Sequence, residues 1–515
     1  MAQNEDVESF KMKPLQIFFN DARSVFRMDE IGKEIFKIAL PAALALTADP
    51  IASLIDTAFI GRIGPVEIAA VGVSIALFNQ VSRIAIFPLV SVTTSFVAEE
   101  DTKSKITPNQ DDESLVTVST ENRESKDAIT SENNKNDSFL DANKFRSPEN
   151  GLEMEKSKTE KRHIPSASSA LLIGGILGIL QAEFLILAAK PLLNFMGVKS
   201  DSPIFKPAEQ YLKLRSVGAP AVLLSLALQG VFRGFKDTKT PLYATVIGDI
   251  MNISLDPIFM FVFKWGVKGA AIAHVLSQYL IVVILFWRLV QQLDLLPPSF
   301  KHLQLNRFLN NGFLLLIRVI AVTFCVTLAA SFAARKGPTS MAAFQVCLQV
   351  WMATSLLADG LAVAGQAQLA SAFTQEDYNR AAAITSRVLQ LGVALGLVLA
   401  IILGVGLKLG AKLFTSDPHV IQLIGVGIPF VAATQPINAL AFVFDGINFG
   451  ASDFAYSAYS MLLVAVLSII CLVILHWGHG LMGIWIALTI YMSLRAFAGF
   501  WRLGTRTGPW RFLKN

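Results

Sequence analysis

Two aspartates interrupt an apolar stretch near the amino terminus, and they are the first residues that could do chemistry. In LTADPIASLID (46–56), Asp49 and Asp56 lie seven residues apart. This spacing is two helical turns, so both side chains lie on one face of a helix. A carboxylate at bilayer depth costs about 2.5–3.5 kcal/mol on insertion scales. A membrane segment that keeps two of them is therefore expected to use them.

A second segment, GDIMNISLDPIF (248–259), has the same arrangement. Asp249, Asn252 and Asp256 fall on one face at i, i+3 and i+7, and in both segments a proline follows one of the aspartates. Two carboxyl groups in a low-dielectric environment favour sharing a proton, because one proton relieves both repulsion and desolvation. The two segments together predict a site that loads and releases protons. The alternative is a structural acid pair held by hydroxyl and amide partners.

His274 lies in a turn of the next helix that is expected to face these acids. Its imidazole titrates near neutral pH. We expect it either to take part in proton coupling or to be a polar packing residue.

Arginines within two other apolar stretches predict recognition of an anion. Arg83 lies in NQVSRIAIF and Arg318 in FLLLIRVIAVTF. A guanidinium is always charged, so at bilayer depth it needs an anion or a wet cavity. The amides Gln80, Gln345 and Gln349 would complete a site for a multivalent carboxylate through forked hydrogen bonds. The alternative is an internal partner, namely Asp49 for Arg83 or a neighbouring carbonyl for Arg318.

Other polar residues of the apolar segments have simpler explanations. Arg215, Arg233 and Arg495 lie nearer predicted helix ends, where long side chains reach the membrane interface. Asp359 stands in the eighth predicted span, and Asp445 is expected near the cytosolic end of the tenth, where solvation accounts for it. The three cysteines lack metal-site spacing and predict small buried packing residues.

The composition places all these residues in a membrane. The chain has 515 residues, 53% hydrophobic and 16% charged, with a mean hydropathy of +0.52. A soluble domain carries about 25% charged residues, so we expect an all-α polytopic membrane protein. Twelve apolar stretches reach spanning length: 35–60, 67–97, 167–189, 208–232, 241–263, 269–290, 309–333, 339–372, 383–407, 420–447, 456–477 and 481–503.

An excess of Lys and Arg in the segments at one side places both chain ends in the cytosol. The polar stretch 99–166 is rich in Ser, Asn, Glu and Lys, and is expected to be a disordered cytosolic loop. The predicted organisation is a cytosolic tail (1–32), spans 1–2 (33–98), this loop (99–166), spans 3–6 (167–293), a cytosolic linker (294–306), spans 7–12 (307–505) and a cytosolic tail (506–515).

Sequence matches relate the two halves of the chain. RIGPVEIAAVGV (62–73) matches RKGPTSMAAFQV (335–346) at a shift of 273 residues. Two later matches, QGVFRG with DGINFG and WGVKGAAIA with HGLMGIWIA, have shifts of 216 and 214. The shift falls by 57 residues after the first match, close to the length of the polar loop. The first half therefore equals the second half plus an inserted loop.

Each half has six spans and so enters and leaves on the same side, which makes the repeat parallel. The two lobes are expected to enclose a central cleft with a substrate site near the midplane. Val322 and Ala329 stand at the repeat positions of Asp49 and Asp56. The fold itself therefore does not require the acids.

Three stretches carry a family resemblance: LIDTAFIGRIG (54–64), QGVFRGFKDTKTPLYATVIGDIMNISLDPIF (229–259) and GVKGAAIA (266–273). With the two six-span repeats, they resemble the multidrug and toxic compound extrusion (MATE) transporters. The long loop after SFVAEEDT (95–102) is similar to the plant citrate-exporting branch. This resemblance implies that Asp56, Asn252 and Asp256 form a first-lobe cation site, and that spans 1, 2, 7 and 8 face the cleft.

The resemblance implies proton-coupled export of citrate, or of a similar small organic anion, from the cytosol by alternating access. It also implies roles in aluminium tolerance and metal homeostasis, and location in the plasma membrane, with an intracellular membrane as the alternative. The proton gradient serves in place of a cofactor, and Na⁺ coupling is the alternative because carboxylates and Asn252 also suit Na⁺. We expect a monomer in the lipid bilayer, without a resident metal or a nucleic-acid partner.

Two rival functions remain. Antiport of organic cations is typical of the wider family, and Arg83 and Arg318 weigh against it. A membrane enzyme is disfavoured because the chain has no HExxH or GxSxG motif, and a primary pump because it has no GxxxxGK[ST] loop. The chain is therefore not expected to be an enzyme.

Overall fold

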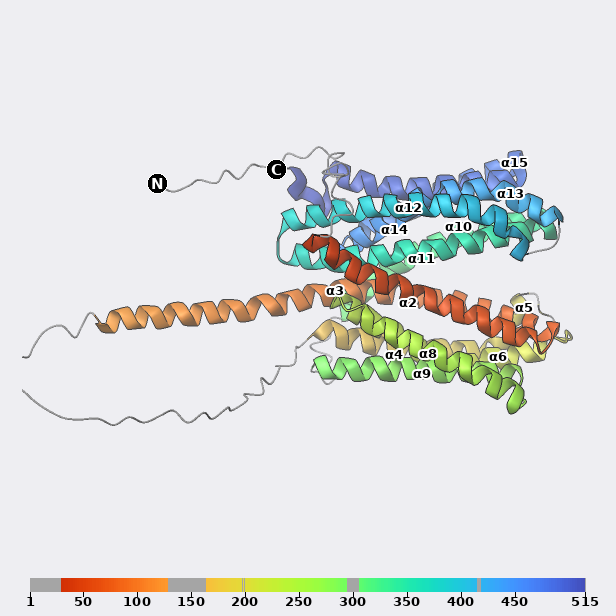
Figure 1. The fold of residues 1–515 in the computed structure, drawn as a ribbon, viewed down its shortest axis with the longest axis horizontal. Coiled ribbons are helices and arrows are strands. Elements are labelled where there is room, and N and C mark those ends of the chain that lie inside the picture. Colours follow the sequence, from red (N-terminus) through yellow and green to blue (C-terminus); the bar gives the residue numbers. More distant parts are fainter. Residues whose placement is uncertain are drawn as a thin grey trace, which may run out of the picture.

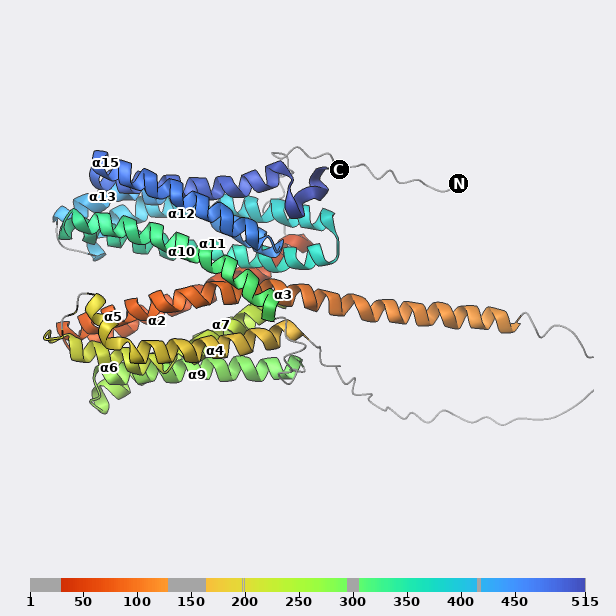
Figure 2. The same cartoon turned by 180° about the vertical axis from the view of Figure 1, so that it is seen from behind.

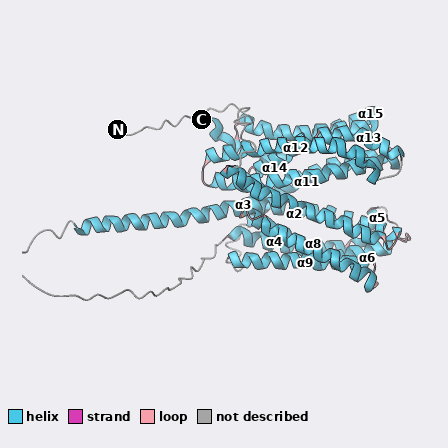
Figure 3. Ribbon diagram, viewed as in Figure 1, coloured by secondary structure: helices cyan, strands magenta, loops and turns pink. Residues whose placement is uncertain are grey.

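The structure is a computed structural model that describes residues 29–127, 164–196, 198, 200–293, 305–414 and 418–514. This part of the chain is helical (Figure 3). The first half forms α2 (Glu30–Gly61), α3 (Pro65–Asp127), α4 (Pro165–Leu187), α5 (Ala189–Phe195), α6 (Phe205–Ser216), α7 (Ala219–Gly234), α8 (Lys239–Pro257), the π-helix η2 (Ile258–Val262) and α9 (Val267–Gln292). The second half forms α10 (Leu305–Arg335), α11 (Pro338–Thr374), α12 (Tyr378–Phe414), α13 (Pro418–Ala433), α14 (Gln435–Gly450), α15 (Phe454–Thr505) and the 3₁₀ helix η3 (Gly508–Lys514).

The helices form two lobes, one from each half of the chain (Figure 1). Eight helices are long and apolar enough to cross a membrane, or eleven spans when the bent pairs in α3, α6–α7 and α13–α14 each count as one. The 52-residue α15 has a non-helical residue at Gly480 and so holds two spans. The total of twelve confirms the predicted fold.

Matching breaks confirm the parallel repeat. Gly266 and Gly480 stand at equivalent positions of the two halves and have φ/ψ of 56°/−132° and 59°/−129°. This region of φ/ψ space is open to glycine and strained for other residues. A Cβ on Gly178 would lie 2.5 Å from Cα of Pro220, and one on Gly396 would lie 2.4 Å from Cα of Pro436. Each lobe therefore uses one close glycine–proline contact to pack its third span against its fourth.

The predicted loop and tails differ in part from the structure. Helix α3 continues to Asp127, although the sequence predicts a disordered loop from residue 99. Extending an existing helix is far cheaper than starting one, and the i,i+4 ion pairs Glu99–Lys103 and Asp101–Lys105 support the extension. Residues 1–28, 128–163 and 294–304 lie outside the described part, and with them most of the amino-terminal tail, the polar loop and the linker.

The carboxy-terminal segment packs against the second lobe. Trp510 in η3 is 1% exposed and meets Phe373 of α11 edge to face, with ring centroids 5.3 Å apart. Phe512 stacks on Tyr378 at 4.7 Å. The predicted tail is therefore part of the folded lobe, because its aromatic residues bury apolar surface against the α11–α12 connection.

The two lobes meet at one end of the molecule. Helix α2 packs on α11, where a Cβ on Gly360 would lie 2.6 Å from that of Ala43. The Nε2 of Gln366 in α11 donates to the Ser91 carbonyl and to the Ser95 hydroxyl of α3. Ser95 donates in turn to the carbonyl of Phe449 in α14. We call the end of the molecule that holds these contacts of Gly360, Gln366, Ser91, Ser95 and Phe449 the tied end. Away from it, α2 and α11 diverge (Figures 1 and 2).

An ion-pair bridge reinforces the tied end. Glu34 of α2 accepts from Lys236, which follows α7, and from Arg380 of α12, both at 2.9 Å. One carboxylate thus joins both lobes. Lys236 and Arg380 belong to segments that the sequence places in the cytosol, so in the predicted orientation the tied end is the cytosolic one.

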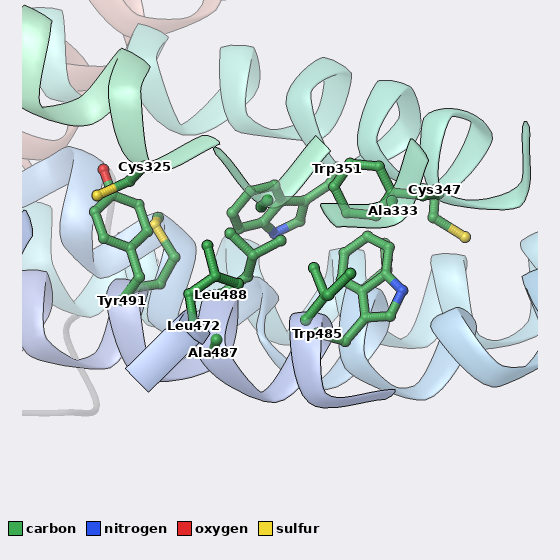
Figure 4. Packing of buried hydrophobic residues seen from close by; sticks show 14 of the residues in the cluster. Cys325, Ala333, Cys347, Trp351, Leu472, Trp485, Ala487, Leu488 and Tyr491 are labelled. Atoms are coloured by element: carbon green, nitrogen blue, oxygen red, sulfur yellow. The ribbon is translucent and has the colours of Figure 1, made fainter. Parts of the chain in front are cut away.

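The core of the second lobe surrounds two of the cysteines (Figure 4). Cys325 and Cys347 are buried beside Trp351, Trp485 and Tyr491, and Cys471 is half-buried. The prediction that the cysteines are packing residues is confirmed for the two buried ones.

Candidate functional site

The predicted acids of the first lobe come together between α2 and α8. The Asn252 side-chain amide donates to both Asp56 carboxylate oxygens at 2.8 Å each. Asp256 is 1% exposed and lies within hydrogen-bonding reach of Asp56. The parallel helices α2 and α8 pack side by side, so the shared i, i+7 spacing brings their acids together.

Asp256 has an unusual environment for a carboxylate. Neither of its oxygens finds a donor among the described residues. A buried carboxylate without donors would be costly, and two facing carboxylates repel each other. A proton held between Asp56 and Asp256 removes both problems, because a protonated carboxyl becomes a donor. The geometry therefore suits a proton site.

A second acid pair lies two turns away. Asp49 and Asp249 are within hydrogen-bonding reach of each other, and one Asp249 oxygen is buried without a partner in the described chain. Seven residues along each helix place this pair about 10 Å from the first pair. Asp49 is exposed and Asp249 half-buried, so this pair is the more accessible of the two.

The sequence interpretation missed Arg215 as a neighbour of these acids. It lies beside the 45° bend between α6 and α7, within electrostatic range of Asp49, Asp56 and His274. Its guanidinium donates to the Tyr211 hydroxyl at 3.1 Å. The prediction of an interfacial anchor was wrong, because the end of α6 is a break within one span. The Gly218–Pro220 signal in the sequence marks this break.

His274 of α9 is half-buried. The α6–α7 bend packs on this part of α9: the Tyr279 hydroxyl donates to the Val217 carbonyl at 3.2 Å. No side-chain hydrogen bond of His274 is seen within the described residues. The charged residue within electrostatic range of His274 is Arg215, and its proposed role in coupling stays a prediction.

The predicted polar residues Gln80, Arg83, Gln345 and Gln349 are exposed, and we call them the cleft wall. Ser91 of α3 contacts the second lobe, and Gln80 lies three helical turns before it. Arg83 lies one turn after Gln80. Gln349 precedes Gly360, which packs on the first lobe, by three turns. By helical rise, these four exposed residues lie about 12–22 Å along α3 and α11 from the contacts between the lobes. Helix α3 bends by 41° between Arg83 and Pro88.

Arg83 has no acid partner. No carboxylate in the described chain lies within ion-pair distance of it, so the alternative pairing with Asp49 is not formed. Ser82 beside it faces the first lobe and accepts from Gln181 of α4 at 2.6 Å. Arg83, the next residue on α3, is exposed and keeps its donors available for another partner.

Arg318 has a different environment from the cleft wall. It is 2% exposed and ion-paired with Asp445 of α14, which also binds Arg495 of α15. Its expected alternative partner, a carbonyl, is replaced by a carboxylate. The predictions that Asp445 is merely solvated and that Arg495 is an interfacial anchor were both wrong. Helix packing brings the three residues together from distant parts of the sequence.

Arg233 was also expected to be an interfacial anchor and is buried, 7% exposed, within electrostatic range of Asp359. Within the described residues, no group of three or more His, Cys, Asp or Glu is arranged to hold a metal ion.

Comparison with known proteins decides the family. The sequence model of the family MatE matches residues 157–258 and 315–474. The chain is 66% identical over 507 residues to Protein DETOXIFICATION 42 of Arabidopsis thaliana, covering 98% of each. The chain belongs to the MATE family. It is also 57% identical to Protein DETOXIFICATION 43 of the same plant, over 98% of this chain and 96% of the relative.

Solved structures agree with this MATE assignment at the level of the fold. A MOP superfamily transporter from Pyrococcus furiosus superimposes with a TM-score of 0.75 at 19% identity, covering 96% of this chain and 99% of that one. The Vibrio cholerae MATE transporter VcmN gives 0.75 at 16% identity, covering 96% and 100%. The protein is thus a multi-pass MATE transporter of small organic substrates, driven by an ion gradient, and not an enzyme.

Proposed function

We propose that the protein exports citrate, or a similar multivalent organic anion, from the cytosol in exchange for protons. The observation that carries this proposal is Arg83, an exposed arginine of α3 without an acid partner in the described chain. A drug cation would be repelled there, whereas a carboxylate can accept two parallel hydrogen bonds from a guanidinium.

The three amides that the sequence predicts for the same site support this chemistry. Gln80 stands one turn away from Arg83 on α3, and Gln345 and Gln349 stand one turn apart on α11. Each amide offers donors to a carboxylate and an acceptor to a hydroxyl. Citrate has three carboxylates and one hydroxyl, so this set of side chains matches its groups.

Proton coupling is proposed for the acid pairs of the first lobe. Asp56 accepts from Asn252, whereas neither oxygen of the neighbouring Asp256 finds a donor among the described residues that would hold it ionised. The pair would take up a proton from the outside and release it to the cytosol. This step would return the transporter to the cytosol-facing state for another cycle. Na⁺ is the alternative coupling ion, because two carboxylates and an amide oxygen are also cation ligands.

Antiport of an organic cation is the second candidate, favoured by the exposed Asp49. A competition experiment separates the two. Proteoliposomes containing the protein are assayed for pH-driven citrate flux and for ethidium flux, each with an excess of the other compound. We expect citrate flux that rises with the proton gradient and is insensitive to ethidium. Ethidium transport without citrate flux would replace the anion proposal by the cation one.

Location in the plasma membrane is part of the proposal. An intracellular membrane is the alternative, since a relative of 44% identity is named Protein DETOXIFICATION 44, chloroplastic. A fluorescent fusion of the full chain in plant cells tests this, with plasmolysis separating the plasma membrane from the wall. Fluorescence confined to plastids would instead place the proposed exchange in the plastid envelope.

A further inference from the structure

Three buried arginines and two half-buried aspartates form a group, the basic cluster, where the lobes meet: Arg233, Arg318, Asp359, Asp445 and Arg495. Arg318 and Arg495 both bind the carboxylate of Asp445. Asp359 of α11 is within electrostatic range of the first-lobe Arg233 and of Asp445. Two carboxylates therefore face three guanidinium groups.

The cluster holds one positive charge more than it can neutralise from the described residues. The three arginines are 2–8% exposed, so water does not screen this charge well. An uncompensated buried charge is strongly unfavourable in a protein interior. A further anion at this place would remove the imbalance.

Donors are available for such an anion. Nε of Arg318, Nε of Arg495 and the Tyr491 hydroxyl are buried and have no hydrogen-bond partner within the described residues. The Phe449 ring lies 5.1 Å from the Arg318 guanidinium, and the Phe442 ring lies 4.6 Å from that of Arg495. Because these rings cover guanidinium faces, the edges with their N–H groups are left for an anion.

A cavity of about 10 Å³, with room for about one water molecule, adjoins the cluster. Its polar lining comes from Asp445, Asn448, Ser457, Ser460 and Arg495, and its apolar lining from Phe444, Met461, Val464, Ala498 and Gly499. Hydroxyl and amide groups beside a guanidinium are suitable partners for a carboxylate.

The repeat shows that the fold does not need these charges. Ala45, Gln229 and Ile281 stand at the first-lobe positions that correspond to Arg318, Asp445 and Arg495. A purely structural ion pair is therefore absent from the equivalent place in a lobe of the same architecture.

The position of the cluster connects it with the movement of the lobes. Phe449, beside Arg318, accepts the hydrogen bond of the first-lobe Ser95. Phe96 and Phe308 also pack in this interlobe core. Separation of the lobes at the tied end would break these contacts and open Arg318 to the cytosolic side.

We infer that the basic cluster is an anion site, in which Arg318 and Arg495 take a carboxylate of the substrate from the cytosol and Asp445 competes for the same arginines. In the state described here, Asp445 occupies them. When a carboxylate arrives from the cytosol, it shares the arginines; when the lobes close, Asp445 displaces it toward the cleft wall. The identity of the substrate as citrate rests on the proposed function, whereas the anion site does not.

The test uses purified full-length protein and measures citrate and chloride binding by calorimetry, beside citrate flux in proteoliposomes. Arg495→Gln combined with Asp445→Asn keeps the local charge balance and is expected to fold. It should weaken citrate binding at least tenfold. Asp445→Asn alone removes the competitor, so it should tighten citrate binding several-fold and slow turnover. Arg288→Gln, an exposed arginine on α9, is the matched control and should behave as the wild type.

The outcomes separate the site from the proposed substrate. If the wild type binds chloride but not citrate, and the double variant loses chloride binding, the anion site is supported and citrate export is overturned. Citrate flux with unchanged KM in the double variant overturns the site and leaves export standing. If Asp445→Asn lowers thermal stability but leaves citrate affinity unchanged, Asp445 is only a structural partner of the arginines. This result also overturns the inference.

Discussion

The two lobes of this transporter share one backbone plan and carry opposite charge. In the first lobe, Asp49, Asp56, Asp249 and Asp256 meet between two helices, with Arg215 as the nearby cation. In the second lobe, two arginines share one aspartate. Both lobes have one close glycine–proline contact and one glycine with positive φ at equivalent positions, Gly266 and Gly480. The repeat thus conserves packing, while the polar residues in each lobe are free to take separate tasks.

This contrast suggests that one lobe binds the coupling cation and the other binds the transported anion. The acid-rich lobe is suited to a proton, and the arginine-bearing lobe and the cleft wall are suited to carboxylates. Four predictions test this contrast, from the largest expected effect to the smallest.

Replacing the buried acids should abolish coupling. Asp56→Asn or Asp256→Asn removes one carboxyl of the pair, so no proton can be shared, and pH-driven citrate flux should fall at least tenfold. Asp201→Asn, on an exposed loop, is the control. Flux is measured in proteoliposomes with and without a pH gradient, and folding is checked by size-exclusion chromatography. Wild-type pH dependence in both variants would eliminate the proton site.

Removing the free arginine should weaken substrate binding. Arg83→Gln deletes charge-assisted hydrogen bonds worth about 1.5–3 kcal/mol, so the KM for citrate should rise about tenfold or more. The pH dependence should persist, because the acids are untouched. Arg288→Gln serves as the control. An unchanged KM would exclude Arg83 from the substrate site.

Matched glycine substitutions test whether the two scaffolds are equivalent. Gly178→Ala and Gly396→Ala each force a Cβ against a proline backbone, and each should cost about 1–3 kcal/mol of stability. A Cβ at Gly72 meets nothing within 4 Å, so Gly72→Ala should leave the melting temperature unchanged or raise it. Melting followed by intrinsic fluorescence measures all three. A large difference in melting temperature between Gly178→Ala and Gly396→Ala would contradict the equivalence of the two lobes.

Weakening the bridge at the tied end should shift the balance between states slightly. Glu34→Gln removes the carboxylate shared by Lys236 and Arg380, and partly exposed pairs of this kind contribute about 0–1 kcal/mol. The population open at this end should rise by up to about fivefold. Electron paramagnetic resonance distances between labels at Lys37 and Glu376 report this change. An unaltered distance distribution would assign the closed state to apolar packing alone.

Much of the architecture could be predicted because it depends on local patterns. Apolar length gave the spans, glycine and proline motifs gave the repeat, and i, i+7 spacing put acids on shared helix faces. Boundaries were less certain: helix α3 continues past residue 99, and the carboxy-terminal aromatic residues pack on the second lobe. Both depend on what surrounds a segment, which composition does not describe.

Residues in the same helix were easier to interpret than residues in different helices. A sequence can show that Asp56 and Asn252 each lie on an apolar helix, and the family pattern linked them. It has no local signal that joins Arg318 to Asp445 and Arg495, which are 127 and 177 residues away. It also cannot distinguish a helix end from a break within a span, so Arg215 was placed at the interface.

The amino-acid sequence by itself determined the membrane class, the twelve spans, the parallel repeat and the acidic faces of two helices, since these follow from hydrophobicity and helical periodicity. Tertiary structure decided which acids pair, that Arg318 has an acid partner while Arg83 has none among the described residues, and at which end the lobes are joined. The physical reason is that partners across helices are selected by close packing of small residues, such as Gly360 on Ala43, and this packing is set by the whole bundle.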